Sequence, residues 1–194
     1  MTAYLKTVAT GFVLALFALL AYAAYGNFTG TANNAGVVGG PFALIDQNGR
    51  GVTSRDFKGR WLIIYFGYTH CPDACPTALN TIGEAIDQLG AKRALVTPIF
   101  ITIDPARDTA AVLKSYLASF GPEFVGLTGS DGAIASAEQT YHVYAAKHST
   151  PDGSYDMDHS SVLYVMDPQG TFVSNFADEI DPATLANRLK SLIP

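Results

Sequence analysis

Continuous apolar runs alternate along this chain with stretches in which apolar residues recur at helical spacing. Trp61 to Phe66 and Val96 to Ile103 are runs of the first kind, as expected of strands buried on both faces of a sheet. Between them, Thr77 to Leu89 carries apolar residues at helical spacing and is followed by Gly90, a natural residue for a helix end. Strands that alternate with helices predict an α/β sheet sandwich.

The remaining elements are predicted from helix caps, apolar spacing and turn residues. They are a helix after the cap pair Asp108-Thr109, a strand at Phe124 to Leu127, a helix capped by Asp131, strands at Ser161 to Met166 and Thr171 to Phe176 around the turn Asp167-Pro168-Gln169-Gly170, and a helix at Pro182 to Leu192.

A small hairpin is predicted at the front of the folded part, where Phe42 to Asp46 and Gly51 to Thr53 flank the turn signal Gln47-Asn48-Gly49-Arg50. The later order, β-α-β-α and then β-β-α, is the order of thioredoxin with extra elements inserted. The predicted fold class is therefore α/β, a thioredoxin-like sandwich with a central mixed sheet flanked by helices. In that order the first core strand ends at a cysteine motif and a helix N-terminus.

The N-terminal apolar stretch, Val8 to Tyr25, is uncharged over 18 residues, just long enough to cross the hydrocarbon core as a helix. Lys6 precedes it, so residues 1–7 are predicted to be a short cytoplasmic N-terminus, with the domain sent across the membrane. Segment 8–25 is predicted to be a transmembrane anchor or uncleaved signal. Ala21-Tyr22-Ala23 is a small-x-small pattern that a signal peptidase can cut, so release of the domain stays the alternative.

Residues 26–40 are rich in Gly, Asn, Thr and Ala and are predicted to be a flexible spacer. Residues 41–194 have the length of one domain with a full core. The formal net charge is -5 and the basic residues are scattered, which argues against nucleic-acid binding. A domain exported in this way faces an oxidising space, either the periplasmic side of a cell inner membrane or the equivalent mitochondrial intermembrane space.

Cys71 and Cys75 are the only cysteines, and they follow the strand Trp61 to Phe66 directly. A disulfide between them closes a very short loop and would stabilise the fold little. A helix N-terminus favours the thiolate, which is both the nucleophile and the metal ligand. Either Pro72 or Pro76 could start that helix. Three residues separate the cysteines, where a thioredoxin-type redox motif has two, so the spacing indicates a task besides electron transfer.

Two thiolates need a third ligand to make a useful transition-metal site, and the chain has four histidines: His70, His142, His148 and His159. His159 is favoured because it stands just before the strand Ser161 to Met166, in the loop that passes over the cysteine motif in a thioredoxin-like fold. His70 adjoins Cys71, but neighbouring side chains usually diverge. His142 and His148 lie at or beyond a helix end, where capping or solvation is expected. Met157 offers a thioether and is equally expected to pack.

Three segments together carry a resemblance to a known family: Gly67-Tyr68-Thr69-His70-Cys71-Pro72-Asp73-Ala74-Cys75-Pro76, Phe100-Ile101-Thr102-Ile103-Asp104-Pro105-Ala106-Arg107-Asp108-Thr109, and the pair Asp158-His159. In this order and at these separations they resemble the Sco family, also called SenC. The resemblance extends to the N-terminal anchor and to the Gly-Gly-Pro-Phe entry at Gly39 to Phe42. Ala74 and Ala106 stand at positions that vary in the family.

The resemblance implies a thioredoxin-like domain that carries copper on two cysteines and one histidine, here Cys71, Cys75 and His159. It also implies a role in maturing the binuclear copper centre (CuA) of cytochrome c oxidase subunit II, with that subunit as partner. Another copper chaperone or a thiol reductase is a further possible partner. The docking face, the oligomeric state and the source of copper are left open by the sequence.

The chemistry of these three side chains agrees with copper, because thiolates and imidazole are soft enough for Cu(I) and also hold Cu(II). Zinc competes, but a structural zinc site needs four ligands, and only Asp73 offers a conceivable fourth. Asp158 is a candidate for orienting the imidazole from outside the ligand set, or for capping a turn. Asp104, Arg107 and Asp108 are interpreted as loop and helix-cap structure, with Arg107 a weaker candidate for partner docking.

Three functions use the same atoms. The preferred one is a copper chaperone, a carrier and not an enzyme. The alternatives are a membrane-tethered thiol-disulfide reductase with Cys71 and Cys75 as its redox pair, and a copper or redox sensor. A peroxiredoxin-like enzyme is also suggested by Cys75-Pro76-Thr77, but the Pro and Thr that precede the peroxidatic cysteine are absent in register.

Overall fold

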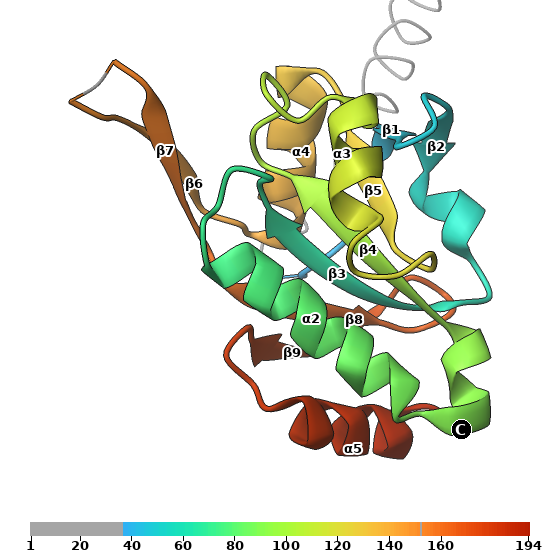
Figure 1. Ribbon diagram of the computed structural model, residues 1–194. Helices are drawn as coiled ribbons and strands as arrows, with labels where there is room; N and C mark the ends of the chain where they lie inside the picture. The colour runs from blue at the N-terminus through green and yellow to red at the C-terminus, as the bar shows by residue number, and fades with distance from the viewer. Residues whose placement is uncertain (1–36, 152) are drawn as a thin grey trace, which may run out of the picture. The chain divides into compact units, whose positions relative to one another are not determined.

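The computed structural model describes residues 37–151 and 153–194. Its framework is a mixed sheet of seven strands. Its strands are β1 (Ala43–Asp46), β2 (Gly51–Thr53), β3 (Trp61–Gly67), β4 (Val96–Thr102), β5 (Val125–Thr128), β8 (Val162–Met166) and β9 (Phe172–Ala177). They lie in the order β2-β1-β5-β4-β3-β8-β9 (Figure 1). Strands β3, β4 and β5 are parallel. Strands β8 and β1 pair antiparallel with β3 and β5, and the outer strands β9 and β2 pair antiparallel with β8 and β1.

Helices cover both faces of the sheet. They are α2 (Ala74–Asp87), α3 (Ala110–Leu117), α4 (Asp131–Tyr141) and α5 (Pro182–Leu192), with short 3-10 helices η1 (Ser54–Phe57) and η2 (Gly90–Leu95). Helices α2 and α5 pack side by side (Figure 1). Tyr65 on β3 contacts Phe100 on β4, which contacts Tyr116 of α3. On the opposite face, the neighbouring residue Phe66 contacts Tyr141 of α4. The two aromatic sets show that each face of the sheet has its own packed layer.

The sequence predicted most of these elements. The front hairpin, the strands at β3, β4 and β5, the closing β8-β9 hairpin and α5 are confirmed within one or two residues of the predicted ends. In the closing turn, Asp167 Oδ1 accepts hydrogen bonds from the backbone N–H groups of Gln169 and Thr171, as a turn-forming aspartate does. The thioredoxin-like core of the prediction is therefore present.

Two helix starts differ from the prediction. Helix α2 begins at Ala74, three residues before the predicted start, with Asp73 at its N-cap and neither proline at the first helical position. Helix α4 is capped by Ser130, whose side chain accepts from the backbone N–H of Ala133, and not by Asp131, which is its first residue. Serine and aspartate are nearly equal as caps, so the sequence alone did not separate these neighbours.

A second sheet of two strands was missed. Strands β6 (Ala145–Ser149) and β7 (Tyr155–His159) pair antiparallel and extend from the body as an arm (Figure 1). The sequence predicts a loop for Tyr155 to His159. Half-buried Tyr155, Met157 and His159 alternate with two exposed aspartates, a period-two pattern typical of a strand. The strand was not predicted because aspartate is rare in strands.

The predicted anchor, residues 8–25, and all but the last four residues of the predicted spacer lie outside the described residues. Within residues 37–151 and 153–194, no helix combines the length and the apolar character needed to cross a bilayer. Anchor and spacer therefore stay predictions.

Candidate metal centre

Strand β3 and helix α2 place the two cysteines. The strand ends at Gly67, the chain turns, and α2 begins at Ala74. Cys71 stands two residues before the N-cap and is partly exposed, whereas Cys75 is the second residue of the helix and is fully buried. Both thiols are free. The pair therefore consists of one thiol at the surface and one beneath it.

The absence of a side chain at Gly67 lets the buried sulfur approach the end of β3. A Cβ at this position would lie 2.8 Å from Cys75 Sγ and 2.9 Å from the ring of Phe100, closer than Cβ contacts in proteins. Gly67 is thus required by the close packing of the sulfur against the strand, and not by backbone conformation.

Asp108 fixes the loop that precedes Cys71. Its carboxylate is fully buried and accepts hydrogen bonds from the backbone N–H of Thr69 (3.0 Å), the hydroxyl of Thr69 (2.5 Å) and the hydroxyl of Thr102 (2.7 Å). Charge-assisted hydrogen bonds of this kind are strong, and together they tie the cysteine loop to the end of β4. Asp108 is therefore a positioning residue, consistent with its interpretation as loop structure.

The sulfur of Cys71 occupies the place of a helix-capping acceptor. It accepts a hydrogen bond from the backbone N–H of Cys75 at 3.3 Å, while the Asp73 side chain caps no N–H. A hydrogen bond with the Cys75 thiol, together with the backbone N–H groups of Cys75 and Asp73 and the nearby His159, lowers the pKa of Cys71 to about 5. Burial opposes this effect but does not outweigh it. At neutral pH Cys71 is a thiolate, ready to act as nucleophile or ligand.

Cys75 has the opposite character. The pKa of the Cys75 thiol is raised, first because this thiol is hydrogen-bonded to the Cys71 thiolate and second because it is buried. The single proton of the pair therefore resides on Cys75. A metal that takes both sulfurs must displace it, so metal binding at this site releases a proton.

His159 reaches Cys75 from the end of β7. Its Nε2 lies 3.6 Å from Cys75 Sγ, and its Nδ1 lies 3.1 Å from the carbonyl oxygen of Ser160. A carbonyl only accepts, so Nδ1 carries the hydrogen and the lone pair of Nε2 faces the sulfur in the neutral ring. The rings of Tyr65 and Tyr68 flank the imidazole edge-on at 5.9 and 6.0 Å. His159 is thus oriented as a metal ligand requires.

The arm that carries His159 is fastened to the body at its other end. Arg107 forms an ion pair with Asp104, lies 3.7 Å above the ring of Tyr155 and donates to the carbonyl of Tyr155 at 3.0 Å. The Tyr155 hydroxyl donates to Asp104 Oδ1 at 2.8 Å. Arg107 is therefore engaged within the chain, where it holds β7, and its side chain is only 19% exposed.

The distances fit one ion shared by sulfur and imidazole. With metal–sulfur and metal–nitrogen bonds of about 2.3 and 2.0 Å, two ligands of a trigonal or tetrahedral ion lie about 3.5–3.7 Å apart. The Cys75 Sγ to His159 Nε2 separation of 3.6 Å matches. Among the described residues, no three His, Cys, Asp or Glu side chains stand close enough together to hold a metal ion. Cys71, Cys75 and His159 instead meet through the contacts of Cys75 with each of the other two.

The other candidate residues lie away from this meeting point. Asp158 faces the opposite side of β7 from His159 and pairs with His148 at 2.7 Å, so its predicted role beside the imidazole gains no support. Asp73 meets Cys71 through its backbone N–H. Met157 packs against the core, and His142 ends α4 in the left-handed conformation. The Nδ1 of His70 lies 3.2 Å from the Thr69 hydroxyl and 4.0 Å from Asp108.

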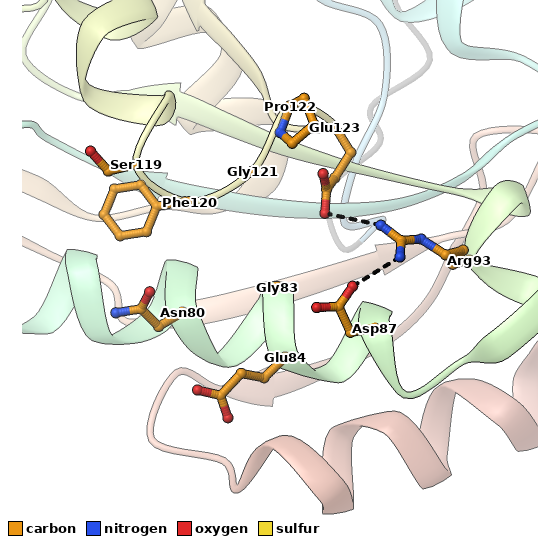
Figure 2. A pocket seen from close by; sticks show the side chains of 10 residues that line it. All are labelled: Asn80, Gly83, Glu84, Asp87, Arg93, Ser119, Phe120, Gly121, Pro122 and Glu123. Atoms are coloured by element: carbon orange, nitrogen blue, oxygen red, sulfur yellow. Dashed lines mark ion pairs between the residues drawn. The ribbon is translucent and has the colours of Figure 1, made fainter.

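A separate polar cleft lies between α2 and the segment that follows α3. It is lined by the second half of α2, the segment after α3 and Arg93 of η2 (Figure 2). Arg93 contacts Asp87 at 3.1 Å and Glu123 at 3.8 Å, so its charge is met from both sides. Along α2 the lining runs from Asn80 to Asp87, which are five and twelve residues beyond Cys75, or roughly 7.5 and 18 Å at the helical rise. This cleft is a structural junction, separate from the cysteine site.

Sequence reasoning missed two residues beside Cys75. Tyr65 and Asp178 are both buried, and the Tyr65 hydroxyl lies 3.1 Å from Asp178 Oδ2 and 3.9 Å from Cys75 Sγ. The only signal in the sequence was a hydroxyl inside the apolar run of β3. The partner Asp178, 113 residues away, carries no local signal.

Fold and site together define a class: a thioredoxin-like domain in which a reactive dithiol and an oriented imidazole converge. The comparisons with known proteins narrow this class. The SCO1/SenC family description matches residues 30–194, and the chain belongs to this family. An SCO2-like protein of Rickettsia felis is 42% identical over 155 residues, which are 79% of this chain and 76% of the relative.

The mitochondrial SCO1 homolog 1 of Arabidopsis thaliana is 41% identical over 77% of this chain, and the match spans only 45% of the relative's length. Solved structures share this fold. Bradyrhizobium japonicum ScoI with copper bound is 48% identical, with a TM-score of 0.74 over 79% of this chain and 98% of the other. Arabidopsis thaliana ScoI with copper bound is 40% identical, with a TM-score of 0.76 over 79% of this chain and 96% of the other. These neighbours confirm the thioredoxin-like α/β fold and hold copper.

Proposed function

We propose that this chain is a copper chaperone that binds one copper ion through Cys71, Cys75 and His159. It would assist the maturation of the CuA centre of cytochrome c oxidase subunit II, the role implied by its family. The observation that carries the proposal is the 3.6 Å approach of the His159 Nε2 lone pair to the sulfur of a cysteine pair. Copper bound in the Bradyrhizobium and Arabidopsis structures supports the choice of metal.

The unequal thiols give the three ligands an order of action. The Cys71 thiolate is partly exposed and charged, so it meets incoming copper first. Cys75 then gives up its proton and binds, and His159 completes the set from the end of β7. Release to an acceptor runs in reverse, because an acceptor thiolate reaches the exposed Cys71 side before the buried Cys75. Cu(I) and Cu(II) both suit two thiolates and an imidazole.

The place of action follows from the predicted anchor. With residues 8–25 in the membrane and 26–40 as tether, the domain would face the periplasm, or the intermembrane space in a mitochondrion. A membrane-bound oxidase subunit is within reach of a domain held in this way.

A second function, reduction of the acceptor's disulfide, is favoured by the pKa of about 5 at Cys71 beside a buried, protonated Cys75. The Cys71 thiolate would attack the target disulfide, forming a mixed disulfide and releasing one target thiolate. Cys75, losing its proton, would then attack the Cys71 sulfur and release the second. Two electrons pass to the target, and the chain ends with a Cys71–Cys75 disulfide. A copper or redox sensor built on the same dithiol is the third possibility.

A two-armed experiment separates delivery from reduction. Copper-loaded protein mixed with the reduced, copper-free acceptor domain of an oxidase subunit II should transfer its copper, measured after the two proteins are separated. Copper-free reduced protein mixed with the disulfide form of the same domain tests reduction, whose rate should fall as pH is lowered through about 5. Copper that stays on the chain while the acceptor disulfide is reduced stoichiometrically would replace delivery by reduction. His159→Ala should impair the first arm and leave the second largely unchanged at neutral pH, because His159 is the smallest of the causes that lower the pKa of Cys71.

A further inference from the structure

Tyr65 has one hydroxyl proton and two acceptors within reach. The hydroxyl lies 3.1 Å from the carboxylate of Asp178 and 3.9 Å from the sulfur of Cys75. Burial, with Cys75 and Asp178 nearby, raises the pKa of Tyr65, so the hydroxyl keeps its proton at neutral pH. A hydroxyl donates a single hydrogen bond. The shorter contact assigns it to Asp178.

Asp178 is placed to accept the hydrogen bond of the Tyr65 hydroxyl in place of Cys75. It follows β9 directly, and its backbone N–H donates to the carbonyl of Ser161 at 3.3 Å. Its side chain is 95% buried, yet it borders a cleft with Asp73, Ala74, Thr77, Ser161 and Glu179 beside the start of α2. A buried carboxylate with one strong donor holds that donor firmly, since losing it would leave a charge unpaired.

We infer that Tyr65 and Asp178 form a positioning pair that sets how strongly Cys75 binds copper. Asp178 keeps the Tyr65 hydroxyl directed away from Cys75, so the sulfur retains its full donor strength toward the metal. When the Asp178 charge is removed by substitution, as in Asp178→Asn, the hydroxyl turns to the Cys75 thiolate, and the hydrogen bond draws electron density from the sulfur. Hydrogen bonds to a thiolate that binds copper change the redox potential of the copper. This inference rests on the proposed copper site.

Two variants and their combination test the pair. Asp178→Asn keeps the shape but removes the charge, and should weaken Cu(II) retention about tenfold, the lower end of the range for groups behind a ligand. It should also raise the Cu(II)/Cu(I) potential and shift the thiolate-to-Cu(II) absorption band to higher energy. In the Tyr65→Phe background the same substitution should change none of these, because Asp178 acts through the hydroxyl. A purely electrostatic effect of the carboxylate would persist in that background.

Tyr164→Phe is the matched control, because it removes a buried hydroxyl from β8 on the opposite face of the sheet, where Tyr164 contacts Phe66 and Tyr141. Thermal unfolding of each copper-free variant establishes that it folds. The inference is wrong if Asp178→Asn has the same effect in the wild-type and Tyr65→Phe backgrounds, or if it has no effect in either background. Both outcomes leave the proposed copper site intact. A wild-type protein that binds no copper overturns the proposed function and this inference together.

Discussion

His159→Ala is expected to weaken Cu(II) retention by at least about 100-fold in competition with a chelator. The substitution removes the imidazole whose Nε2 lies 3.6 Å from Cys75 Sγ. Two thiolates remain, and because they suit the softer Cu(I), its retention should fall less. Even groups that only orient a ligand typically contribute ten- to hundredfold to metal affinity, so a ligand itself should contribute more. The measurement is the copper that remains bound at increasing chelator concentrations.

The matched control is His148→Ala, which makes the same change on the neighbouring strand of the same arm. His148 is about half exposed and pairs with Asp158, on the side of the arm away from the sulfurs. Its loss should leave copper retention within about twofold of wild type, since exposed pairs contribute little to stability. Equal losses in the two variants would show that the arm as a whole, and not the His159 imidazole, supports binding.

Asp108→Ala is expected to lower the free energy of unfolding by about 3 kcal/mol. The fully buried carboxylate accepts from the Thr69 N–H and from the hydroxyls of Thr69 and Thr102. Removing it leaves the buried Thr102 hydroxyl and the half-buried Thr69 donors without their acceptor, at a cost of about 1–3 kcal/mol for each group that water cannot reach. Urea unfolding of the reduced, copper-free protein measures the change. Copper retention should fall as well, because the loop before Cys71 is no longer held.

Asp158→Ala gives the comparison for that experiment. Asp158 is 67% exposed, and its ion pair with His148 lies in solvent, so the change in unfolding free energy should stay below about 1 kcal/mol. The account of the cysteine loop would be wrong if Asp108→Ala were as mild as this control.

The sequence predicted the elements whose signal is local. Buried parallel strands such as β3 and β4 are continuous apolar runs, and turns such as Asp167 to Gly170 carry their own chemistry. The β6-β7 arm was missed because its outward side chains are aspartates, and its stability comes from a distant clamp. Arg107, Asp104 and Tyr155 form that clamp across 48 to 51 residues of chain. Packing of this kind leaves no periodic trace in the sequence.

The three proposed ligands were also predicted before the structure, from residue type, order and family resemblance. The unequal acidity of the two thiols was not, because it depends on which cysteine precedes the helix and which lies inside it. Cys71 became the capping acceptor only because α2 starts at Ala74. Asp158 was expected beside the imidazole from its position in the sequence, but alternation along β7 turns it away.

The proposed copper site is tested by the copper bound per chain after a chelator challenge, measured in the reduced wild-type protein and in the double variant Cys71→Ser, Cys75→Ser. We expect one copper per chain in the wild type and none in the double variant, because the serine hydroxyls are poor ligands for Cu(I). Thermal unfolding establishes that the double variant is folded. One copper retained by the folded double variant would contradict the account, since the metal would then be bound elsewhere on the chain.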